Sequence, residues 1–287
     1  MRLIITGSTG YLGQRLALQA ARDHDVVAGF SRHPDAVTAG EPVHLDFLKP
    51  QALAESLKNL KLRAGHDAVI HTAALNPGGD ENWMHTVNVE GSRLVAQAAA
   101  DAHVRLIHIS TDVVHDGRHA PYPDNAEPKP LGTYGRTKAD AEKAVLKAHP
   151  DAVIVRTSLI YGLHALDNGT ASFVKRIESG EPLKLFHDVH RQPIWVESLA
   201  KALVELAHNR HTGHLNIAGR QSLTREAFGR KMLRYWQIPE PYRIESVSAA
   251  KISDKIPLDL RLNISRAESM GLRLPGVDKV LAAAAVF

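Results

Sequence analysis

Leu3-Ile4-Ile5-Thr6-Gly7-Ser8-Thr9-Gly10-Tyr11-Leu12-Gly13 is the stretch that decides the fold. Its three apolar residues predict a short buried strand, and apolar residues at helical spacing, from Leu12 to Ala20, predict a helix. Glycines at positions 7, 10 and 13 lie between the two elements. Gly7 permits a sharp bend, Gly10 lets the backbone approach a ligand, and Gly13 lets the helix lie close to the strand. Because the start of a helix offers N–H groups to a phosphate, the stretch predicts a dinucleotide site rather than an ordinary turn.

The composition of the 287 residues is that of an ordinary globular protein. The net charge is +4 and the basic residues are scattered, which argues against a nucleic-acid or membrane patch. No apolar stretch nears the length of a membrane-spanning helix, and there is no cysteine for disulfides or thiolate chemistry. The first residues already belong to the predicted strand and turn, so we expect no signal peptide and a cytoplasmic location.

Strand and helix patterns alternate through the first half of the chain. Near-continuous apolar strands separated by helices indicate a parallel sheet that is covered on both faces. We therefore predict an α/β fold of the Rossmann type, with a doubly wound parallel sheet. Strands are expected at 26–30, 43–45, 67–71, 105–109 and 152–155, and helices at 51–60, 83–100 and 134–147.

The pattern changes after about residue 160. We predict a dinucleotide-binding domain over 1–160 and a smaller substrate-binding lobe over 161–287, which closes a cleft at the carboxyl edge of the sheet. The helix at 196–208 is strongly amphipathic, and we expect it to pack back on the sheet domain. The other elements expected in this half are helices at 171–179, 224–235 and 277–285 and a strand at 183–186.

Tyr134 and Lys138 lie four residues apart, so a helix places both on one face. An ordinary tyrosine, with a pKa of about 10, is a poor acid–base group at neutral pH. A nearby ammonium favours the phenolate and lowers the pKa, so that Tyr134 could exchange a proton with a carbonyl or hydroxyl oxygen. A surface Tyr/Lys pair is the simpler alternative.

Ser110, Thr111 and Asp112 follow the strand expected at 105–109. That places them at the carboxyl end of a parallel strand, where a hydroxyl could donate a hydrogen bond to the oxygen that Tyr134 protonates. A simple turn or helix cap is the alternative, because these three residue types favour turns.

Together these motifs resemble an extended short-chain dehydrogenase/reductase, and within that superfamily the dTDP-4-dehydrorhamnose reductase family. Further stretches that carry the resemblance are Asn88-Val89-Glu90-Gly91, Arg156-Thr157-Ser158-Leu159-Ile160-Tyr161, Asn216-Ile217-Ala218-Gly219 and Arg261-Leu262-Asn263-Ile264-Ser265. The resemblance covers nearly the whole chain and implies a reductase in which Thr111, Tyr134 and Lys138 are catalytic. It also implies a cofactor site built from Gly7, Thr9, Gly10, Tyr11, Leu12, Gly13, Asp46, Phe47, Ala73, Ala74, Asn88, Ser110, Ser158 and Leu159, with Tyr134 and Lys138 beside the nicotinamide.

The end of the second strand predicts which nicotinamide cofactor is used. An NAD site places an acidic residue there, but this chain has Ser31 and Arg32. Arg32 can bind a 2′-phosphate and Ser31 can donate a hydrogen bond to it, which favours NADP(H). A solvated loop arginine is the alternative.

The substrate remains open at this point. Arg191 and Arg261 are candidates for contact with a substrate phosphate or carboxylate, and Asp112 is a third candidate in the substrate site. The histidines at 187, 190, 208, 211 and 214 have no cysteine beside them, and Gly213 breaks the helical spacing, so we expect no metal site.

The first hypothesis is an NADPH-dependent reductase of a 4-keto-6-deoxy sugar nucleotide, with a simpler ketone or aldehyde as the next choice. An NADP-binding regulatory protein without turnover, similar to the methionine adenosyltransferase regulatory subunit, is the second. A sugar-nucleotide dehydratase or epimerase ranks lower, because dehydratases of this group carry Glu where Val113 stands. A homodimer is expected by analogy with relatives alone.

Overall fold

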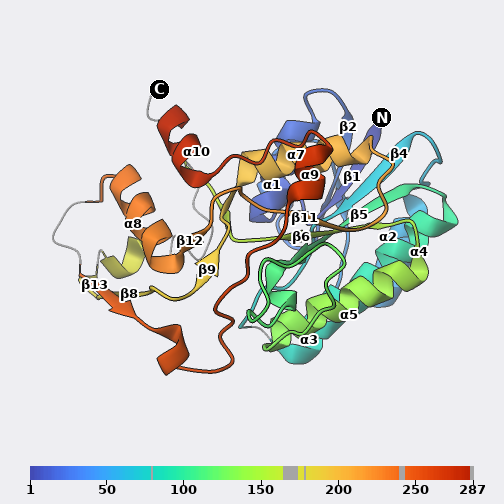
Figure 1. Ribbon diagram of the computed structural model, residues 1–287. Coiled ribbons are helices and arrows are strands. Elements are labelled where there is room, and N and C mark those ends of the chain that lie inside the picture. Colours follow the sequence, from blue (N-terminus) through green and yellow to red (C-terminus); the bar gives the residue numbers. More distant parts are fainter. Residues whose placement is uncertain (79, 164–173, 178, 239–242, 285–287) are drawn as a thin grey trace.

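The computed structural model describes residues 1–78, 80–163, 174–177, 179–238 and 243–284 (Figure 1). Its centre is a sheet of seven parallel strands in the order β11-β6-β5-β4-β1-β2-β3. The doubly wound parallel sheet predicted from the sequence is confirmed. The strands are β1 (Arg2–Thr6), β2 (Asp25–Phe30), β3 (Glu41–His44), β4 (Asp67–His71), β5 (Arg105–Thr111), β6 (Val153–Thr157) and β11 (Gly213–Ile217).

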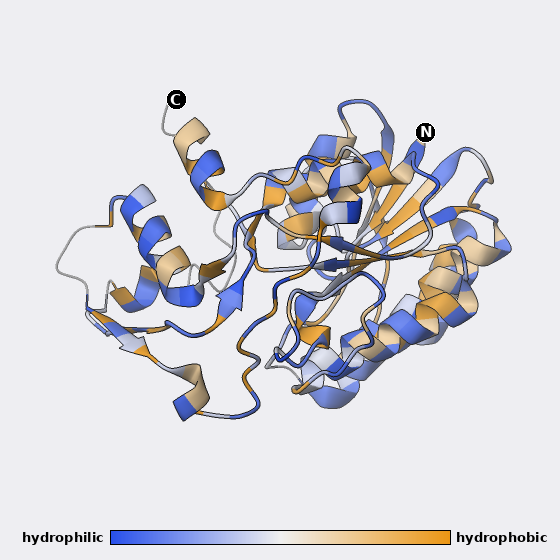
Figure 2. Cartoon of the chain, viewed as in Figure 1, coloured by the Kyte–Doolittle hydropathy of each residue, from blue (hydrophilic) through white to orange (hydrophobic). Residues whose placement is uncertain are grey.

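Helices cover both faces of this sheet. Alternate residues of each strand point to opposite faces, and because both sets are apolar, both faces must be buried. Leu3 and Ile5 face α1 and α7, whereas Ile4 faces α2, α4 and α5. Figure 2 shows the strands as largely hydrophobic and the helices as banded. The bounds of these helices are α1 (Tyr11–Ala20), α2 (Pro50–Asn59), α4 (Ser92–Asp101), α5 (Thr133–Ala148) and α7 (Val196–Ala207).

The single helix expected over 83–100 is interrupted. α3 (Glu81–His85) and α4 are joined by a π-helical turn, Thr86–Gly91. The Ser92 hydroxyl donates to the carbonyl of Asn88 at 2.6 Å, while the Asn88 side chain holds the backbone of Leu75. The π-helical turn therefore places the Asn88 side chain where it can hold the loop that follows β4. Single π-helical turns inside α-helices are often found at functional sites.

The second half of the chain contributes elements alternately to the layers of the sheet and to a smaller lobe. α7 packs against α1, and β11 extends the sheet beside β6, so both belong to the sheet layers. The sequence pattern does not predict β11. α9 (Ser265–Ser269) and the residues around it also pack on the sheet.

The lobe lies to one side of the sheet in Figure 1. β8 pairs in parallel with β13, α8 packs against β8, and Val277 and Val280 of α10 share a cluster with Phe228 and Met232 of α8. The helix expected at 171–179 falls partly outside the described residues. The remaining strands and α-helices of the described residues are β7 (Ile160–Tyr161), β8 (Leu183–Phe186), β9 (His190–Arg191), β10 (Ile194–Trp195), β12 (Leu223–Thr224), α8 (Arg225–Tyr235), β13 (Ile244–Val247) and α10 (Val277–Ala284).

Across the described ranges, no helix is long and apolar enough to cross a membrane.

Candidate active site

A cavity of about 980 Å³ lies at the carboxyl ends of β1, β4, β5 and β6. The glycine turn after β1, the loop after β4, the end of β5 and the first turns of α5 form its walls. The second half of the chain contributes Arg191, Lys255 and Pro257. The predicted site residues that line this cavity are Gly7, Gly10, Tyr11, Leu12, Gly13, Ala74, Ser110, Thr111, Tyr134, Lys138, Ser158, Leu159 and Arg191.

The glycine turn has no room for side chains where the strand meets the helix. Gly7 has a φ of +69°, and a Cβ there would lie 2.7 Å from the nitrogen of Ala73. A Cβ on Gly13 would lie 2.1 Å from the Gly7 carbonyl oxygen. Gly10 differs, because its Cβ would meet only that same oxygen, at 3.2 Å. Gly10 therefore leaves the start of α1 accessible from the cavity, as a bound diphosphate requires.

Thr111 and Tyr134 face the same cavity from β5 and from the first turn of α5. The Thr111 hydroxyl makes only long contacts, both 3.4 Å, to the Asp112 carboxylate and the Val113 nitrogen. Hydrogen bonds of that length are weak, so the hydroxyl can turn to a substrate oxygen. Within the described part of the chain, the Tyr134 hydroxyl has no hydrogen-bond partner. Both hydroxyls are thus available to a third group in the cavity.

The pKa of Tyr134 is raised to about 12, chiefly by burial and then by the charge of Asp112, although Arg191 opposes the shift. The expectation that Lys138 lowers the Tyr134 pKa is therefore wrong. The reason is geometric, because the Lys138 ammonium donates to the Ile109 carbonyl oxygen at 2.6 Å, on the sheet side of the helix. The phenol consequently stays protonated at neutral pH and can act as an acid.

A buried ion pair joins α5 to β6 of the sheet. The Arg156 guanidinium and the Glu142 carboxylate are almost completely buried and lie 2.7 Å apart. The Ser110 hydroxyl donates to Glu142 as well, so it is committed to this network rather than free for a ligand. Hydrogen bonds from His214, Arg156 and Ser110 hold the pKa of Glu142 at about 2, against the opposing effect of burial.

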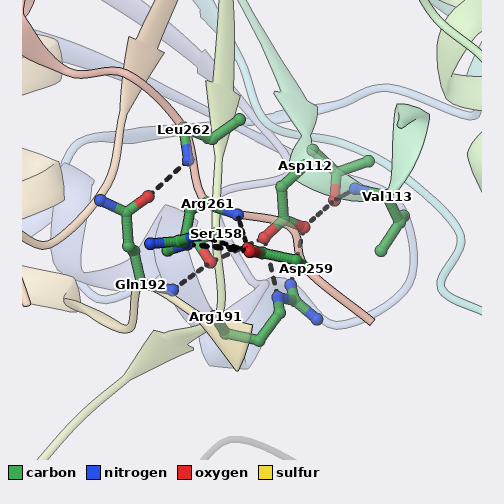
Figure 3. A network of polar contacts seen from close by, with 9 residues as sticks. Asp112, Val113, Ser158, Arg191, Gln192, Asp259, Arg261 and Leu262 are labelled. Atoms are coloured by element: carbon green, nitrogen blue, oxygen red, sulfur yellow. Dashed lines mark hydrogen bonds and ion pairs between the residues drawn. The ribbon is translucent and has the colours of Figure 1, made fainter. Parts of the chain in front are cut away.

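Asp112 is a fully buried carboxylate that joins the two halves of the chain (Figure 3). Arg191 donates to it twice, at 2.8 and 2.7 Å, and the Ser158 hydroxyl donates at 2.7 Å. The Ser158 oxygen in turn accepts from the Gln192 nitrogen. The structure thus places Asp112 behind the cavity wall, where it holds Arg191 in place, rather than on the lining where a substrate would contact it.

Arg261 does not reach the lining. Its guanidinium pairs with Asp259 at 2.7 Å and is 42% exposed. Lys255, which was not predicted, does line the cavity. Among the described residues it takes part in no ion pair. The sequence gives no signal for Lys255, because its position depends on how the chain returns from the lobe through the bridge between His190 and Asp259.

Asp46 and Phe47 also lie off the lining. The Asp46 carboxylate caps the nitrogen of Leu48, at 3.1 Å. The Phe47 ring is buried against Gly91 and stacks on His71 with ring centres 5.5 Å apart. Phe47 is therefore part of the hydrophobic core, on the face of the sheet that α2 and α4 cover.

The other selected residues frame the site indirectly. Asn88 is buried and bonds both backbone groups of Leu75 and the Thr137 hydroxyl, which fixes the loop after β4. Ala73 packs against Gly7, and the Thr9 carbonyl accepts from Gln14.

Ser31 and Arg32 lie just beyond β2, whose end is tied to the glycine turn by the bond from the Ser8 nitrogen to the Gly29 carbonyl. Arg32 is exposed and, over the described ranges, its guanidinium has no partner. No three potential metal ligands come together within the described residues.

Comparison with known proteins identifies the family. The family model described as "RmlD substrate binding domain" matches residues 1–275. A dTDP-4-dehydrorhamnose reductase of Mycobacterium tuberculosis is 32% identical over 267 residues, covering 89% of this chain and 82% of the relative. Methionine adenosyltransferase 2 subunit beta of Mus musculus is 28% identical over 285 residues, covering 94% and 83%.

Among solved structures, a dTDP-4-dehydrorhamnose reductase of Bacillus anthracis in complex with NADP superposes with a TM-score of 0.81 at 22% identity, covering 98% of this chain and 97% of that one. At that identity the likeness concerns the fold alone. The sequence matches carry the assignment: this chain belongs to the RmlD substrate binding domain family and is an extended short-chain dehydrogenase/reductase of the dTDP-4-dehydrorhamnose reductase type.

Proposed function

We propose that this protein is an NADPH-dependent reductase of a 4-keto-6-deoxy sugar nucleotide. The observation that carries the proposal is that Thr111, Tyr134 and Lys138 line the same cavity as the glycine turn. A carbonyl held between the two hydroxyls would thus lie beside a nicotinamide whose diphosphate rests at the start of α1. Relatives named as reductases of this class support the same chemistry.

The residues present fit a dinucleotide. Gly7 and Gly13 make the close turn, Gly10 leaves space over it, and Ser158 and Leu159 wall the far end of the cavity. Arg32 can bind the 2′-phosphate of NADPH. The end of β2 carries no acidic side chain of the kind that binds the ribose 2′-hydroxyl in NAD sites. When bound, NADPH supplies the hydride, and the protein supplies orientation and the proton.

Tyr134 supplies that proton. Because its pKa lies at about 12, the phenol is neutral throughout the physiological range and ready to protonate the oxygen that becomes an alkoxide. Thr111 donates a hydrogen bond to the same oxygen and fixes its direction. The neutral phenol is the form that a reduction requires.

The cavity offers two kinds of substrate contact. Arg191 is neutralised by Asp112, and its remaining nitrogen, Nη1, has no partner in the described chain, so it suits an uncharged sugar oxygen. Lys255 lines the same cavity, its charge has no ion-pair partner within the described ranges, and it suits a diphosphate. A nucleotide sugar combines both groups, whereas a simple ketone has only one.

The test is an activity assay with purified protein, a panel of nucleotide sugars bearing a 4-keto group, and small ketones and aldehydes. We expect loss of reduced-nicotinamide absorbance with NADPH and a 4-keto-6-deoxy sugar nucleotide, and much less with NADH. Tight NADPH binding without turnover of any carbonyl would contradict the proposal. That outcome would favour a regulatory protein such as the methionine adenosyltransferase subunit that shares 28% identity.

Lys255→Met should raise the KM for the nucleotide sugar by about tenfold and change kcat little, because a rim cation binds ground state and transition state alike. Added salt should shrink the difference, since exposed charges are screened. Steady-state kinetics with Lys251→Met as the matched control checks this, because Lys251 lies on the same segment but not on the lining. An unchanged KM would place the diphosphate elsewhere.

A dehydratase is disfavoured because the apolar Val113 lines the cavity where an additional carboxyl group would be needed. The homodimer and the cytoplasmic location stay predictions.

A further inference from the structure

Two buried histidines lie side by side beneath α5. His71 on β4 and His108 on β5 are register partners, and their ring centres are 5.2 Å apart. His71 is fully satisfied, since Nδ1 lies 2.6 Å from the Thr6 hydroxyl and Nε2 lies 2.9 Å from the Ser92 hydroxyl. His71 thus has a complete structural explanation in the core.

His108 has no such explanation. Its Nε2 lies 3.3 Å from the Lys138 ammonium nitrogen, and its Nδ1 is buried with no hydrogen-bond partner in the described chain. A buried polar nitrogen without a partner is costly. An apolar side chain would avoid that cost, so the contact with Lys138 is the feature that distinguishes a histidine here.

The Lys138 ammonium has three N–H donors. One is directed to the Ile109 carbonyl oxygen at 2.6 Å and a second to His108, while the residue lines the cavity. Two fixed acceptors on β5 determine where the third donor points. Because Lys138 also lines the cavity, the third donor is left for a group bound there, which the proposed function takes to be the nicotinamide ribose.

We propose that His108 is a positioning residue, whose Nε2 accepts a hydrogen bond from Lys138 and keeps the ammonium both charged and aimed at the cofactor. The role towards the cofactor rests on the proposed function, whereas the contact between His108 and Lys138 does not. It assigns the neutral imidazole its proton on Nδ1, which leaves the lone pair of Nε2 facing Lys138.

The charged surroundings agree with this role. Burial lowers the pKa of Lys138 to about 8, and Glu142 on the same helix opposes that shift. Burial, Lys138 and His71 together hold the pKa of His108 well below its ordinary value, so His108 is neutral. The groups that face Lys138 are therefore two neutral imidazoles from β4 and β5 and one carboxylate from α5. Removing the Nε2 acceptor would destabilise the ammonium and lower the Lys138 pKa further.

The experiment measures the Lys138 pKa directly, by NMR of the Cε signal in protein with labelled lysines, with Lys138→Met to assign the signal. The variants are His108→Gln, whose amide reaches the position of Nε2, and His108→Asn, whose shorter amide does not. His149→Gln is the matched control, because the His149 ring is also buried but contacts the Val104 carbonyl oxygen rather than Lys138. NADPH affinity across the pH range is the second readout.

We expect the Lys138 pKa to fall by about one unit in His108→Asn and to stay near the wild-type value in His108→Gln and His149→Gln. NADPH affinity at pH 8 should then be about fivefold weaker in the Asn variant, because fewer molecules carry the ammonium. An unchanged Lys138 pKa in a folded His108→Asn variant would overturn the inference, whatever the cofactor binding. A shifted pKa in a protein that binds no NADPH would support the His108 contact and defeat the proposed function instead.

Discussion

Tyr134→Phe is expected to lower kcat for the nucleotide sugar by about 10²- to 10⁴-fold, the usual contribution of a general acid. The phenol faces the cavity, lacks a hydrogen-bond partner among the described residues and carries its proton at neutral pH. The phenyl ring keeps the shape of the wall, so NADPH affinity should change less than about twofold. Stopped-flow or steady-state kinetics, together with fluorescence titration of NADPH, measures both quantities.

The pH dependence sharpens this prediction. In the reductive direction, the wild-type kcat should show no loss due to Tyr134 below about pH 9, because its pKa is about 12. An alkaline decrease near pH 8 should instead follow Lys138, whose pKa is about 8. Tyr235→Phe, in the lobe and off the cavity lining, is the control and should retain full activity. Turnover that survives in Tyr134→Phe would exclude the phenol as the acid.

Glu142→Gln is expected to cost about 3–5 kcal/mol of unfolding free energy, because it leaves the Arg156 guanidinium buried without a counter-charge. Arg156 is completely buried, and among the described residues its hydrogen bonds are accepted by Glu142 and by the backbone carbonyl oxygens of Asp124 and Ala126. Glu245→Gln is the control, since its pair with Arg243 is exposed and worth at most about 1 kcal/mol. Urea unfolding followed by circular dichroism gives the difference.

The sign of the pH effect follows from the depressed pKa of Glu142. The stability that this carboxylate contributes is fully present above the ordinary glutamate pKa of about 4.3 and is lost as the pH falls towards 2. The stability deficit of Glu142→Gln should therefore be larger at pH 7 than at pH 3.5. The double variant Glu142→Leu/Arg156→Met should recover much of the loss, because apolar replacement of both partners removes the unpaired charge. A single variant as stable as the wild type would show that the pair is not needed.

Local sequence signals predicted the parts of the fold that depend on few residues. The strand, glycine turn and first helix form one continuous unit, and steric contacts inside that unit explain Gly7 and Gly13. Tyr134 and Lys138 are one helical turn apart, so a helix alone brings them to one face. Parallel strands place their ends at one edge of the sheet, which explains why Thr111 reaches the same cavity as Tyr134.

The remainder depends on contacts between distant segments, which a local pattern cannot contain. The direction of the Lys138 ammonium is set by β5, thirty residues earlier, and the pKa of Tyr134 is raised by burial and by Asp112, which no local pattern contains. The sequence predicts Arg191 as a substrate contact, but it contains no sign of the pairing with Asp112, 79 positions away, which forms only when the chain is folded. β11 is short and partly polar, and only its pairing with β6 makes it a strand of the main sheet.

The repeated passage of the chain between the sheet and the lobe has a consequence for engineering. The described part of the lobe is assembled from elements that are separate in the sequence, β8, then α8 and β13, then α10, while α7, β11 and α9 return to the sheet between them. A chimera that exchanges substrate preference with a homologue must therefore transplant several inserts at once, and no single cut site would yield an autonomous recognition module.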